Sequence, residues 1–279
     1  MCWYKKPKPQ NLEVNMLSVI IPTYRNPTYL DLCLQSLVTG QQNHNEIIVV
    51  VDGYEEESAQ VVSKYKGITV INLPTNQGMQ AAINIGVWNA TSEKILIVND
   101  DNVFPARWDT RIEAQYHLNT VMTINQIEPT GPGMFNFPVV DCGTTVETFD
   151  MDTFLAADLK LSKNVVTKDG NIFPFLINKK WFMAVGGFDT WYNSPNLCDW
   201  DFFAKLELIN TVGYARTHSV HVYHFGSVAT KKNSEADSFR AREQHAVSQY
   251  HYKWGYGPYN GKDNTKFPPE GLTYYQSII

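Results

Sequence analysis

The sequence predicts an α/β protein with a mostly parallel central sheet flanked by helices. Three observations support this prediction. Short runs of β-branched and aliphatic residues recur in the N-terminal third of the chain, segments with helical spacing separate them, and polar or turn-forming residues follow them. The resulting order, β-α-β-α-β-α-β, is typical of parallel strands whose crossover helices cover both faces of a sheet.

The first strand is expected at residues 17–23, LSVIIPT, a β-branched run that opens into a loop at Pro22. A helix is expected over residues 26–38, because apolar side chains recur there at i, i+3, i+4, i+7 and i+8 and so share one helix face. Residues 46–51, EIIVVV, predict a second buried strand, which Asp52 and Gly53 stop.

The remaining elements of this half follow the same alternation. Residues 55–65 predict a helix with glutamates in its first turn, where the helix dipole favours anions. Residues 68–73, ITVINL, predict a third strand, and residues 94–98, KILIV, predict a fourth. Between them a helix is expected over residues 78–90. Its small residues, spaced four apart, allow close packing on the sheet: Ala82, Gly86 and Ala90.

The second half of the chain is less regular. Residues 129–150 are rich in Gly, Pro and Thr and predict loops with short strands. Residues 174–189 predict a strand or a helix start before a glycine turn. Residues 198–210 predict a helix, residues 219–230 a strand with a loop, and residues from 231 onward a polar helix. We expect one domain over residues 16–255, preceded by an extended arm (1–15) and followed by an aromatic tail (256–279).

Composition narrows the class of protein. The chain has 279 residues, a formal charge of −5 and a pI near 5.8, so we expect no stable nucleic-acid partner. The four cysteines form no CxxC pair, which argues against a zinc site and favours a reducing compartment. No apolar stretch is long enough to span a bilayer and no signal peptide is evident. We therefore expect a cytoplasmic protein, with association at a membrane surface left open.

Several motifs of other enzyme classes are missing. The first strand is followed neither by GxxxxGK[ST] nor by GxGxxG, which argues against a P-loop ATPase and a dinucleotide dehydrogenase. No GxSxG is present, which argues against an α/β-hydrolase.

Polar residues gather where the predicted parallel strands end. Ligands of such sheets bind at the carboxyl ends of the strands. Pro22, Thr23 and Tyr24 lie at one such end, Asp52 lies at a second, and residues 99–102, NDDN, lie at a third. We therefore expect a ligand at this edge of the sheet.

Asp100 and Asp101 are adjacent carboxylates, which repel one another unless water or a cation solvates them. Two interpretations stay open at this point. In an exposed loop, hard oxygen ligands suit Mg²⁺ or Mn²⁺ with a diphosphate completing the shell. The alternative is an ordinary turn, because Asn and Asp are common turn formers.

Asp199 and Asp201 open the predicted helix at 198–210, and they fit either helix capping or a general base aimed at an attacking hydroxyl. His221 and His224 lie on and just past a predicted strand. Both histidines could have a purely structural role. His224, at the exit of the strand, also fits an Mn²⁺ shell shared with distant aspartates.

In ordered blocks over residues 17–255 the chain resembles family 2 glycosyltransferases, including their rhamnosyltransferase-like members. Their fold is the Rossmann-like GT-A fold. The blocks are LSVIIPTYRNPTYLDLCLQSL, EIIVVVDGYEEES, LPTNQGMQAAINIGVWNATSEKILIVNDDNVFP, AVGGFDTWYNSPNLCDWDF, YHFGSVAT and HYKWG. Two departures stand out: Asn99 takes the place of the first Asp of the family's DxD motif, and Cys198 takes the place of a Glu before the base.

The resemblance implies a metal-dependent, inverting transfer of a sugar from a nucleotide-diphospho-sugar, most simply a UDP-sugar, to a hydroxyl of a glycan or another acceptor. Mn²⁺ or Mg²⁺ would be the cofactor. It also implies a nucleotide-binding half (16–105) and a C-terminal acceptor half (106–255). The implied roles are these: catalytic base, Asp199; metal ligands, Asp101 and His224; donor contacts, Pro22, Thr23, Tyr24, Arg25, Asp52, Asn76, Gly78, Asn84 and Asp100; acceptor side, Gly187, Phe188, Asp189, Trp200 and Asp201.

Two other functions remain alternatives. A nucleotidyltransferase also places carboxylates around Mg²⁺ at strand ends, but it normally carries a glycine-rich basic loop where this chain has PTYRNPTYL. A non-catalytic sugar- or partner-binding module could keep the same fold. The sequence identifies neither the sugar and the acceptor nor the oligomeric state.

Overall fold

The computed structural model describes residues 16–53, 55–130, 137–170, 172–192, 197–210, 212–226 and 236–255, the last range without the side chains of 236–240. The expected arm at 1–15, the expected tail at 256–279 and the end of the YHFGSVAT block lie outside the described residues.

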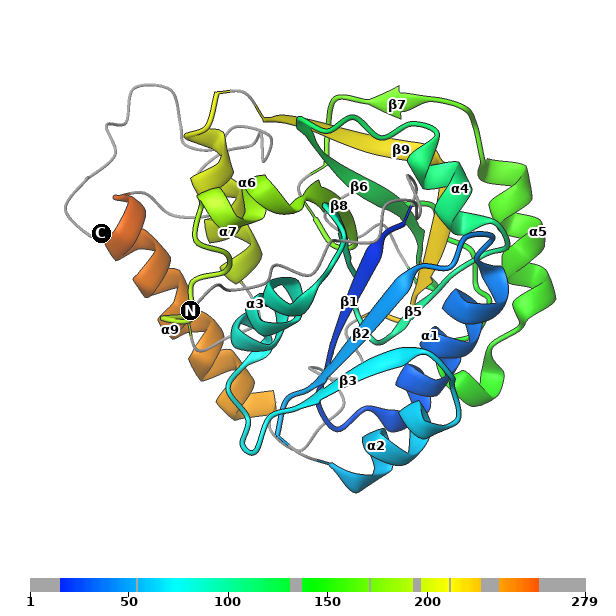
Figure 1. Cartoon of the computed structure of the whole chain (residues 1–279), viewed down its shortest axis with the longest axis horizontal. Coiled ribbons are helices and arrows are strands. Elements are labelled where there is room, and N and C mark those ends of the chain that lie inside the picture. Colours follow the sequence, from blue (N-terminus) through cyan, green and yellow to red (C-terminus); the bar gives the residue numbers. More distant parts are fainter. Residues whose placement is uncertain are drawn as a thin grey trace, which may run out of the picture.

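A nine-stranded mixed sheet forms the centre of the protein, in the order β3-β2-β1-β4-β8-β6-β9-β5, with β7 paired to β9 beside this path (Figure 1). The strands are β1 (Ser18–Thr23), β2 (Glu46–Val51), β3 (Ile68–Asn72), β4 (Lys94–Ile97), β5 (Asn102–Val103), β6 (Thr120–Ile127), β7 (Val166–Thr167), β8 (Phe175–Asn178) and β9 (Gly213–His224).

Helices surround this sheet. They are α1 (Pro27–Gly40), α2 (Glu56–Ser63), α3 (Met79–Asn89), α4 (Trp108–Glu113), α5 (Met151–Leu161), α6 (Lys179–Ala184), α7 (Cys198–Glu207) and α9 (Ala236–Trp254), with a 3₁₀ turn, η1, at Val146–Thr148. The α/β class and the flanking helices predicted from the sequence are confirmed.

The N-terminal half follows the predicted order, and its four strands β1 to β4 pair in parallel around β1. Their carboxyl ends therefore meet at one edge of the sheet, as expected. The third strand differs from its neighbours: β3 is the edge strand, and its side chains are exposed or half-buried. An edge position explains this difference, because β3 has a neighbour on one side only.

The C-terminal half extends the sheet with strands of both directions. β8 pairs antiparallel with β4 and with β6, β6 pairs parallel with β9, and β5 pairs antiparallel with β9. Sequence analysis assigned no element to β6, α4 or α5. For residues 174–189 the sequence predicted a strand or a helix start before a glycine turn. The structure contains both, since β8 is followed by α6 and then by a turn with two positive-φ glycines.

Each face of the sheet has its own apolar core. Ile20 of β1 packs on one side with α3, α6, α7 and α9, whereas Val19 and Ile21 pack on the other side with α1, α2 and α4. This alternation follows from the period of two along a strand. Gly86 of α3 lies directly on the sheet: a Cβ there would come within 2.5 Å of Cγ2 of Ile20. The close helix–sheet packing predicted from the small residues of this helix is therefore present.

None of the helices in the described part of the chain combines the length and the apolar character needed to cross a bilayer.

Candidate functional site

The polar residues predicted at the strand ends do converge at the carboxyl edge of the sheet. Thr23 ends β1, Asp52 follows β2, and Asp100 and Asp101 follow β4, which is hydrogen-bonded to β1. The expectation that the NDDN loop is exposed is wrong. Asp100 and Asp101 are only 8% and 5% exposed, because the β1–α1 turn and the end of β9 pack against them.

Asp100 ties the NDDN loop to the turn after β1. Its Oδ2 accepts a hydrogen bond from Thr23 Oγ1 at 2.7 Å, and its Oδ1 accepts one from Asn26 Nδ2 at 2.9 Å. Burial, together with the charge of Asp101, raises the pKa of Asp100 to about 7, while the two hydrogen bonds act in the opposite direction. With both oxygens engaged, Asp100 primarily positions the loop that carries Asp101.

Asp101 faces a histidine from the far end of the chain. β5 pairs with β9 so that Asn102 lies opposite His224, and this register places His224 Nε2 3.7 Å from Asp101 Oδ1. The other ring nitrogen, Nδ1, lies 3.2 Å from Oε1 of Glu128. The two residues predicted as metal ligands are thus neighbours, although 123 positions separate their numbers in the chain.

This pair fits a hard or borderline cation. Bonds to Mg²⁺ are about 2.0–2.1 Å long, so a gap of 3.7 Å between carboxylate oxygen and imidazole nitrogen is within the span of two ligands of one ion. Within the described ranges, no group of three or more His, Cys, Asp or Glu side chains could hold a metal alone. Such an ion would therefore need further oxygens, and the phosphates of a substrate can supply them.

The β1–α1 turn presents two side chains beside Asp100. Tyr24 and Arg25 are exposed, whereas Pro22 and Thr23 are buried in the strand. Arg25 has a left-handed backbone with φ of 52°, and its guanidinium carbon lies 5.1 Å from the centre of the Tyr24 ring. Of the predicted donor contacts in this turn, Tyr24 and Arg25 are the ones that a ligand can reach.

Asp52 holds the loop before α3. Its oxygens accept hydrogen bonds from the backbone N–H groups of Gln77 at 2.6 Å and Gly78 at 2.9 Å. Burial raises its pKa despite these bonds. Asn76 is exposed in the same loop, and Gly78 begins α3 with φ of 92°, a conformation that favours glycine. Asp52 therefore positions the loop, while Asn76 remains open to a ligand.

Asn84, predicted as a donor contact, is hydrogen-bonded to the glycine turn after α6. Its Nδ2 donates to the carbonyl of Phe188 and its Oδ1 accepts from the N–H of Phe188, both at 2.8 Å. Gly187, with φ of 69°, makes this approach possible, because a Cβ there would lie 2.4 Å from Asn84 Oδ1. Both polar atoms of Asn84 thus fix the glycine turn on α3.

Asp199 lies in the first turn of α7, two residues after its N-cap. The N-cap is Leu197, whose side chain makes no capping hydrogen bond, so Asp199 is not the N-cap residue itself. Its Oδ1 accepts the N–H of Trp200 at 2.9 Å. Burial raises the pKa of Asp199 to about 6, against the effect of this bond. Asp199 and Trp200 are both half-buried, so an acceptor can reach them.

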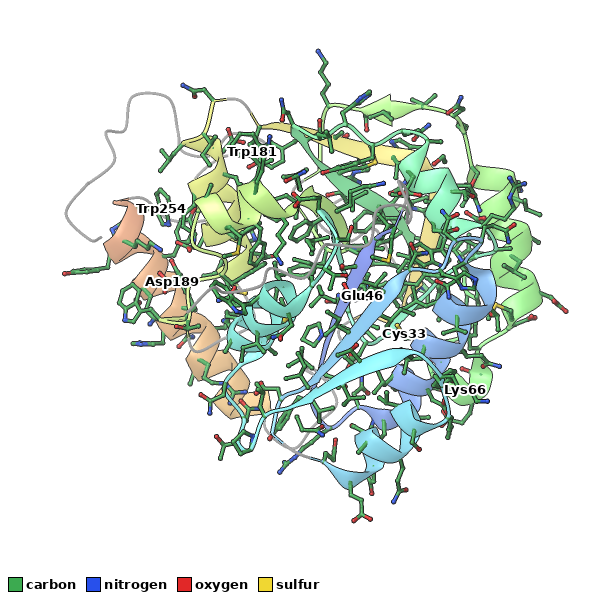
Figure 2. The ribbon with its side chains drawn as sticks, viewed as in Figure 1. Cys33, Glu46, Lys66, Trp181, Asp189 and Trp254 are labelled. Carbon is green, nitrogen blue, oxygen red and sulfur yellow. The ribbon has the colours of Figure 1, made fainter. Side chains whose placement is uncertain are left out.

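Asp201 cannot contact an acceptor, which corrects a second prediction, because its side chain is fully buried. Its Oδ1 accepts hydrogen bonds from Trp254 Nε1 at 2.9 Å and Tyr192 OH at 3.3 Å, and Lys253 Nζ lies 2.8 Å away. Lys253 also pairs with Asp189 at 2.6 Å. Figure 2 labels Asp189 and also Trp254, the last residue of α9. Lys205 Nζ lies 3.6 Å from Oδ2 of Asp201. We call Asp189, Asp201, Lys205 and Lys253 the α9 clamp.

Phe188 and Gly187, also predicted on the acceptor side, lie beside this clamp. Phe188 is buried and stacks on Phe202 with ring centres 4.5 Å apart, while the carbonyl of Gly187 accepts from Lys205 Nζ at 2.5 Å. Both residues therefore contact α7, through Phe202 and Lys205.

His221, the other histidine that the sequence analysis considered on this strand, has a structural role. His221 is buried, its backbone N–H donates to Asp158 Oδ1 at 2.9 Å, and Asp158 is paired with Arg111 at 2.8 Å. This network joins α4 and α5 to β9 three residues before His224.

Glu128 is the site residue that sequence reasoning missed. It follows β6, an element that the sequence did not predict, and the sequence around it contains no recognisable motif. Only the pairing of β6 with β9 brings Glu128 to His224.

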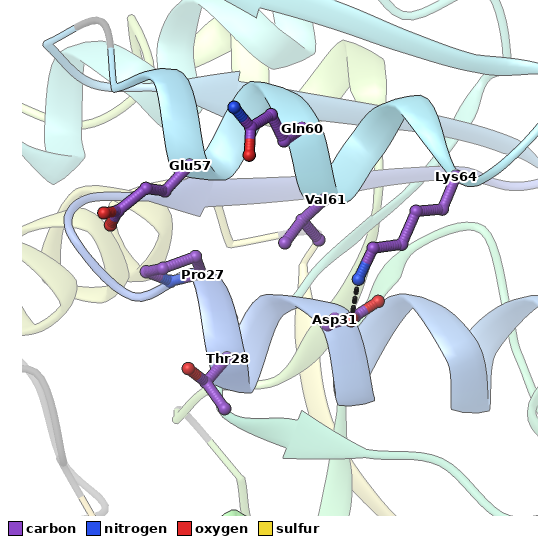
Figure 3. Close-up of a pocket in the computed structure, with 7 residues that line it drawn as sticks. All are labelled: Pro27, Thr28, Asp31, Glu57, Gln60, Val61 and Lys64. Carbon is purple, nitrogen blue, oxygen red and sulfur yellow. Dashed lines mark hydrogen bonds and ion pairs between the residues drawn. The ribbon is translucent and has the colours of Figure 1, made fainter.

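A shallow depression of about 400 Å³ lies between α1 and α2 and contains none of the predicted site residues. Its lining includes Lys64, which is paired with Asp31 at 2.5 Å (Figure 3). We assign it no role.

Comparison with known proteins identifies the family. The family described as "Glycosyl transferase family 2" matches residues 18–158, about half of the chain. The chain belongs to glycosyltransferase family 2. The matched residues contain Asp52, Asp100 and Asp101 but end before Asp199 and His224.

Similar proteins agree with this assignment. An uncharacterized glycosyltransferase of Haemophilus influenzae is 28% identical over 196 residues, which cover 68% of this chain and 62% of the relative. The chain thus spans less than two thirds of the length of this relative, and about one third of the length of a mouse dolichyl-phosphate beta-glucosyltransferase that is 35% identical over 100 residues.

Solved structures confirm the GT-A-like fold. S. aureus TarS 1-349 in complex with UDP has a TM-score of 0.57 at 18% identity, over 88% of this chain and 74% of that one. The mannosyltransferase PcManGT from Pyrobaculum calidifontis, in complex with GDP-Man and Mn²⁺, has a TM-score of 0.58 at 16% identity, over 86% of this chain and 64% of that one.

Proposed function

We propose that this protein is a metal-dependent, inverting glycosyltransferase that moves a sugar from a nucleotide-diphospho-sugar, of UDP type, to an acceptor hydroxyl. The observation that carries the proposal is the meeting of Asp101 and His224 at the carboxyl edge of the sheet. Family membership and the donor complexes of two similar folds support it: TarS with UDP, and PcManGT with GDP-Man and Mn²⁺.

The donor would lie across the carboxyl ends of β1, β2 and β4. Tyr24 offers an exposed ring, and Arg25 carries an exposed guanidinium that can bind a phosphate. Asp52 and Asp100 keep the surrounding loops in place through the hydrogen bonds described above. Asn76, exposed in the loop before α3, completes the side of the site that faces the nucleoside.

Asp101 and His224 would hold Mn²⁺ or Mg²⁺ together with the two phosphates of the donor. The chemistry that this ion supplies when bound is Lewis-acid stabilisation of the charge on the departing diphosphate. His224 would bind the ion through Nε2, because Nδ1 faces Glu128.

Asp199 would be the general base that takes the proton from the acceptor hydroxyl as its oxygen attacks the anomeric carbon from the side opposite the diphosphate. This attack leads to inversion through an oxocarbenium-like transition state. A pKa of about 6 suits the role, since the carboxylate is ionised at neutral pH yet more basic than an ordinary aspartate. Trp200, beside it in the first turn of α7, offers a half-buried ring to an acceptor.

Titration calorimetry with UDP-, GDP- and dTDP-sugars, with and without Mn²⁺, tests the donor side. The dTDP-sugars are included because residues 223–230 resemble rhamnosyltransferase-type members. We expect one donor to bind in a metal-dependent manner, and Asp101→Ala to abolish that dependence. If no nucleotide sugar binds in any condition, the transferase proposal is wrong and a non-catalytic module becomes the better account.

The acceptor side needs a separate assay. Asp199→Ala should bind the same donor with unchanged affinity but fail to transfer or hydrolyse it. Release of nucleoside monophosphate and pyrophosphate from a nucleoside triphosphate would instead indicate a nucleotidyltransferase. The anomeric configuration of the product, read by NMR, decides between inversion and retention.

A further inference from the structure

We propose that Glu128 is a positioning residue for His224: it accepts a hydrogen bond from Nδ1–H and so directs the lone pair of Nε2 toward Asp101 and the metal. This inference rests on the proposed function, in which Asp101 and His224 are metal ligands. It adds a residue that neither the family motifs quoted above nor the sequence pattern singles out.

The geometry separates Glu128 from the metal position. Glu128 Oε1 lies 3.2 Å from Nδ1 of His224, and Asp101 Oδ1 lies 3.7 Å from Nε2 of the same ring. The two nitrogens of an imidazole point in different directions, so the ring stands between the two carboxylates. Asp101 is therefore placed to share an ion with His224, whereas Glu128 is placed to orient the ring.

Two backbone hydrogen bonds hold Glu128 in position. Its N–H donates to the carbonyl of Pro138 and its own carbonyl accepts from the N–H of Val140, both at 3.1 Å. These bonds form a parallel bridge between Glu128 and Val139 directly after β6. The carboxylate thus extends from a paired backbone and not from a free loop.

Partial burial strengthens the interaction. The side chains of Glu128 and His224 are 19% and 14% exposed, so water screens their attraction only in part. A neutral imidazole carries one proton, and a carboxylate at Nδ1 selects the tautomer in which Nδ1 holds it. Nε2 then carries the lone pair that a metal ligand needs, and a carboxylate on the other nitrogen is the usual outer-shell partner of a metal-binding histidine.

The first measurement is the tautomer of His224 in the protein without metal, from ¹⁵N-edited NMR of the imidazole at a pH where the ring is neutral. We expect the Nδ1–H form in the wild type and a shift toward Nε2–H in Glu128→Gln and Glu128→Ala. A wild-type ring in the Nε2–H form would overturn the inference. Because no metal is needed, this result stands whether or not the proposed function is right.

The second measurement is the affinity for Mn²⁺ in the presence of UDP, from the EPR signal of free Mn²⁺. Loss of an outer-shell partner typically weakens metal binding about 10- to 100-fold, and we expect this for both Glu128 variants. Glu93→Gln, an identical chemical change at an exposed residue before β4, should bind as the wild type does. His224→Ala should weaken binding at least as much as either Glu128 variant.

The outcomes distinguish the two proposals. If the wild type binds Mn²⁺ and both Glu128 variants bind it equally well, the proposed function stands and the role of Glu128 is wrong. If Glu128→Ala is weaker than His224→Ala, Glu128 is itself a ligand and the positioning role is again wrong. If the wild type binds no Mn²⁺ with UDP or another nucleoside diphosphate, the metal site of the proposed function fails first.

Discussion

Replacing Lys253 by methionine should destabilise the protein far more than the same change at Lys64. Lys253 Nζ lies 2.8 Å from Asp201 Oδ1, and these two side chains are 16% and 0% exposed. Lys64 pairs with Asp31 at 2.5 Å, but these side chains are 56% and 33% exposed. Methionine keeps most of the aliphatic stem in both variants, so the comparison isolates the charge.

The free-energy cost of Lys253→Met depends on which hydrogen bonds and charges Asp201 keeps in the variant. Removing one partner of a buried pair costs about 3–5 kcal/mol, because the other charge is left uncompensated. Oδ1 keeps the hydrogen bonds from Trp254 and Tyr192, but Oδ2 accepts no hydrogen bond within the described residues, and Lys205 Nζ is 3.6 Å from it. We therefore expect about 3 kcal/mol for Lys253→Met and about 0–1 kcal/mol for Lys64→Met.

Urea unfolding at neutral pH, followed by far-ultraviolet circular dichroism, measures both changes as shifts of the midpoint at constant slope. The double variant Lys253→Met, Asp201→Asn supplies the decisive control. If the cost arises from an unpaired buried carboxylate, neutralising Asp201 should recover about 1 kcal/mol or more. Equal losses at Lys253 and Lys64, or no recovery in the double variant, would refute this reasoning.

Three further predictions concern pH and the glycine turn. In pH–rate profiles, the transfer rate of the wild type should decrease below about pH 6, because Asp199 becomes protonated there. Asp199→Asn should lower kcat about 10²–10⁴-fold, and its remaining activity should not show this decrease at low pH. Gly187→Ala should lower the melting temperature more than Gly186→Ala, since both glycines have positive φ but only Gly187 lies against Asn84; equal shifts would contradict this. Burial alone would lower the pKa of Lys253, but the carboxylates of Asp201 and Asp189 raise it above the ordinary 10.5. The stability that Lys253 contributes should therefore be constant from pH 7 to 10 and decline only at higher pH. The difference in unfolding free energy between the wild type and Lys253→Met measures this contribution.

The sequence alone predicted the N-terminal half and the edge at which the site lies. Apolar periodicity is a local property, so β1 to β4 and their helices could be assigned from neighbouring residues. Because ligands of parallel sheets bind at the carboxyl ends of the strands, Thr23, Asp52 and Asp101 could also be assigned to one edge. Asp199 in the first turn of a helix and His224 at the end of a strand were likewise local features, and both are confirmed in position.

Burial and long-range pairing decided the rest. Asn and Asp often bind ligands, but here both side chains form hydrogen bonds within the protein. Asn84 bonds to Phe188, 104 positions away, and Asp201 bonds to Trp254, 53 positions away. A buried polar group must find a partner when it leaves water, and the tertiary structure alone determines which partner is within reach. Glu128 shows the converse: no local pattern marks it, yet the pairing of β6 with β9 brings its carboxylate to the ring of His224.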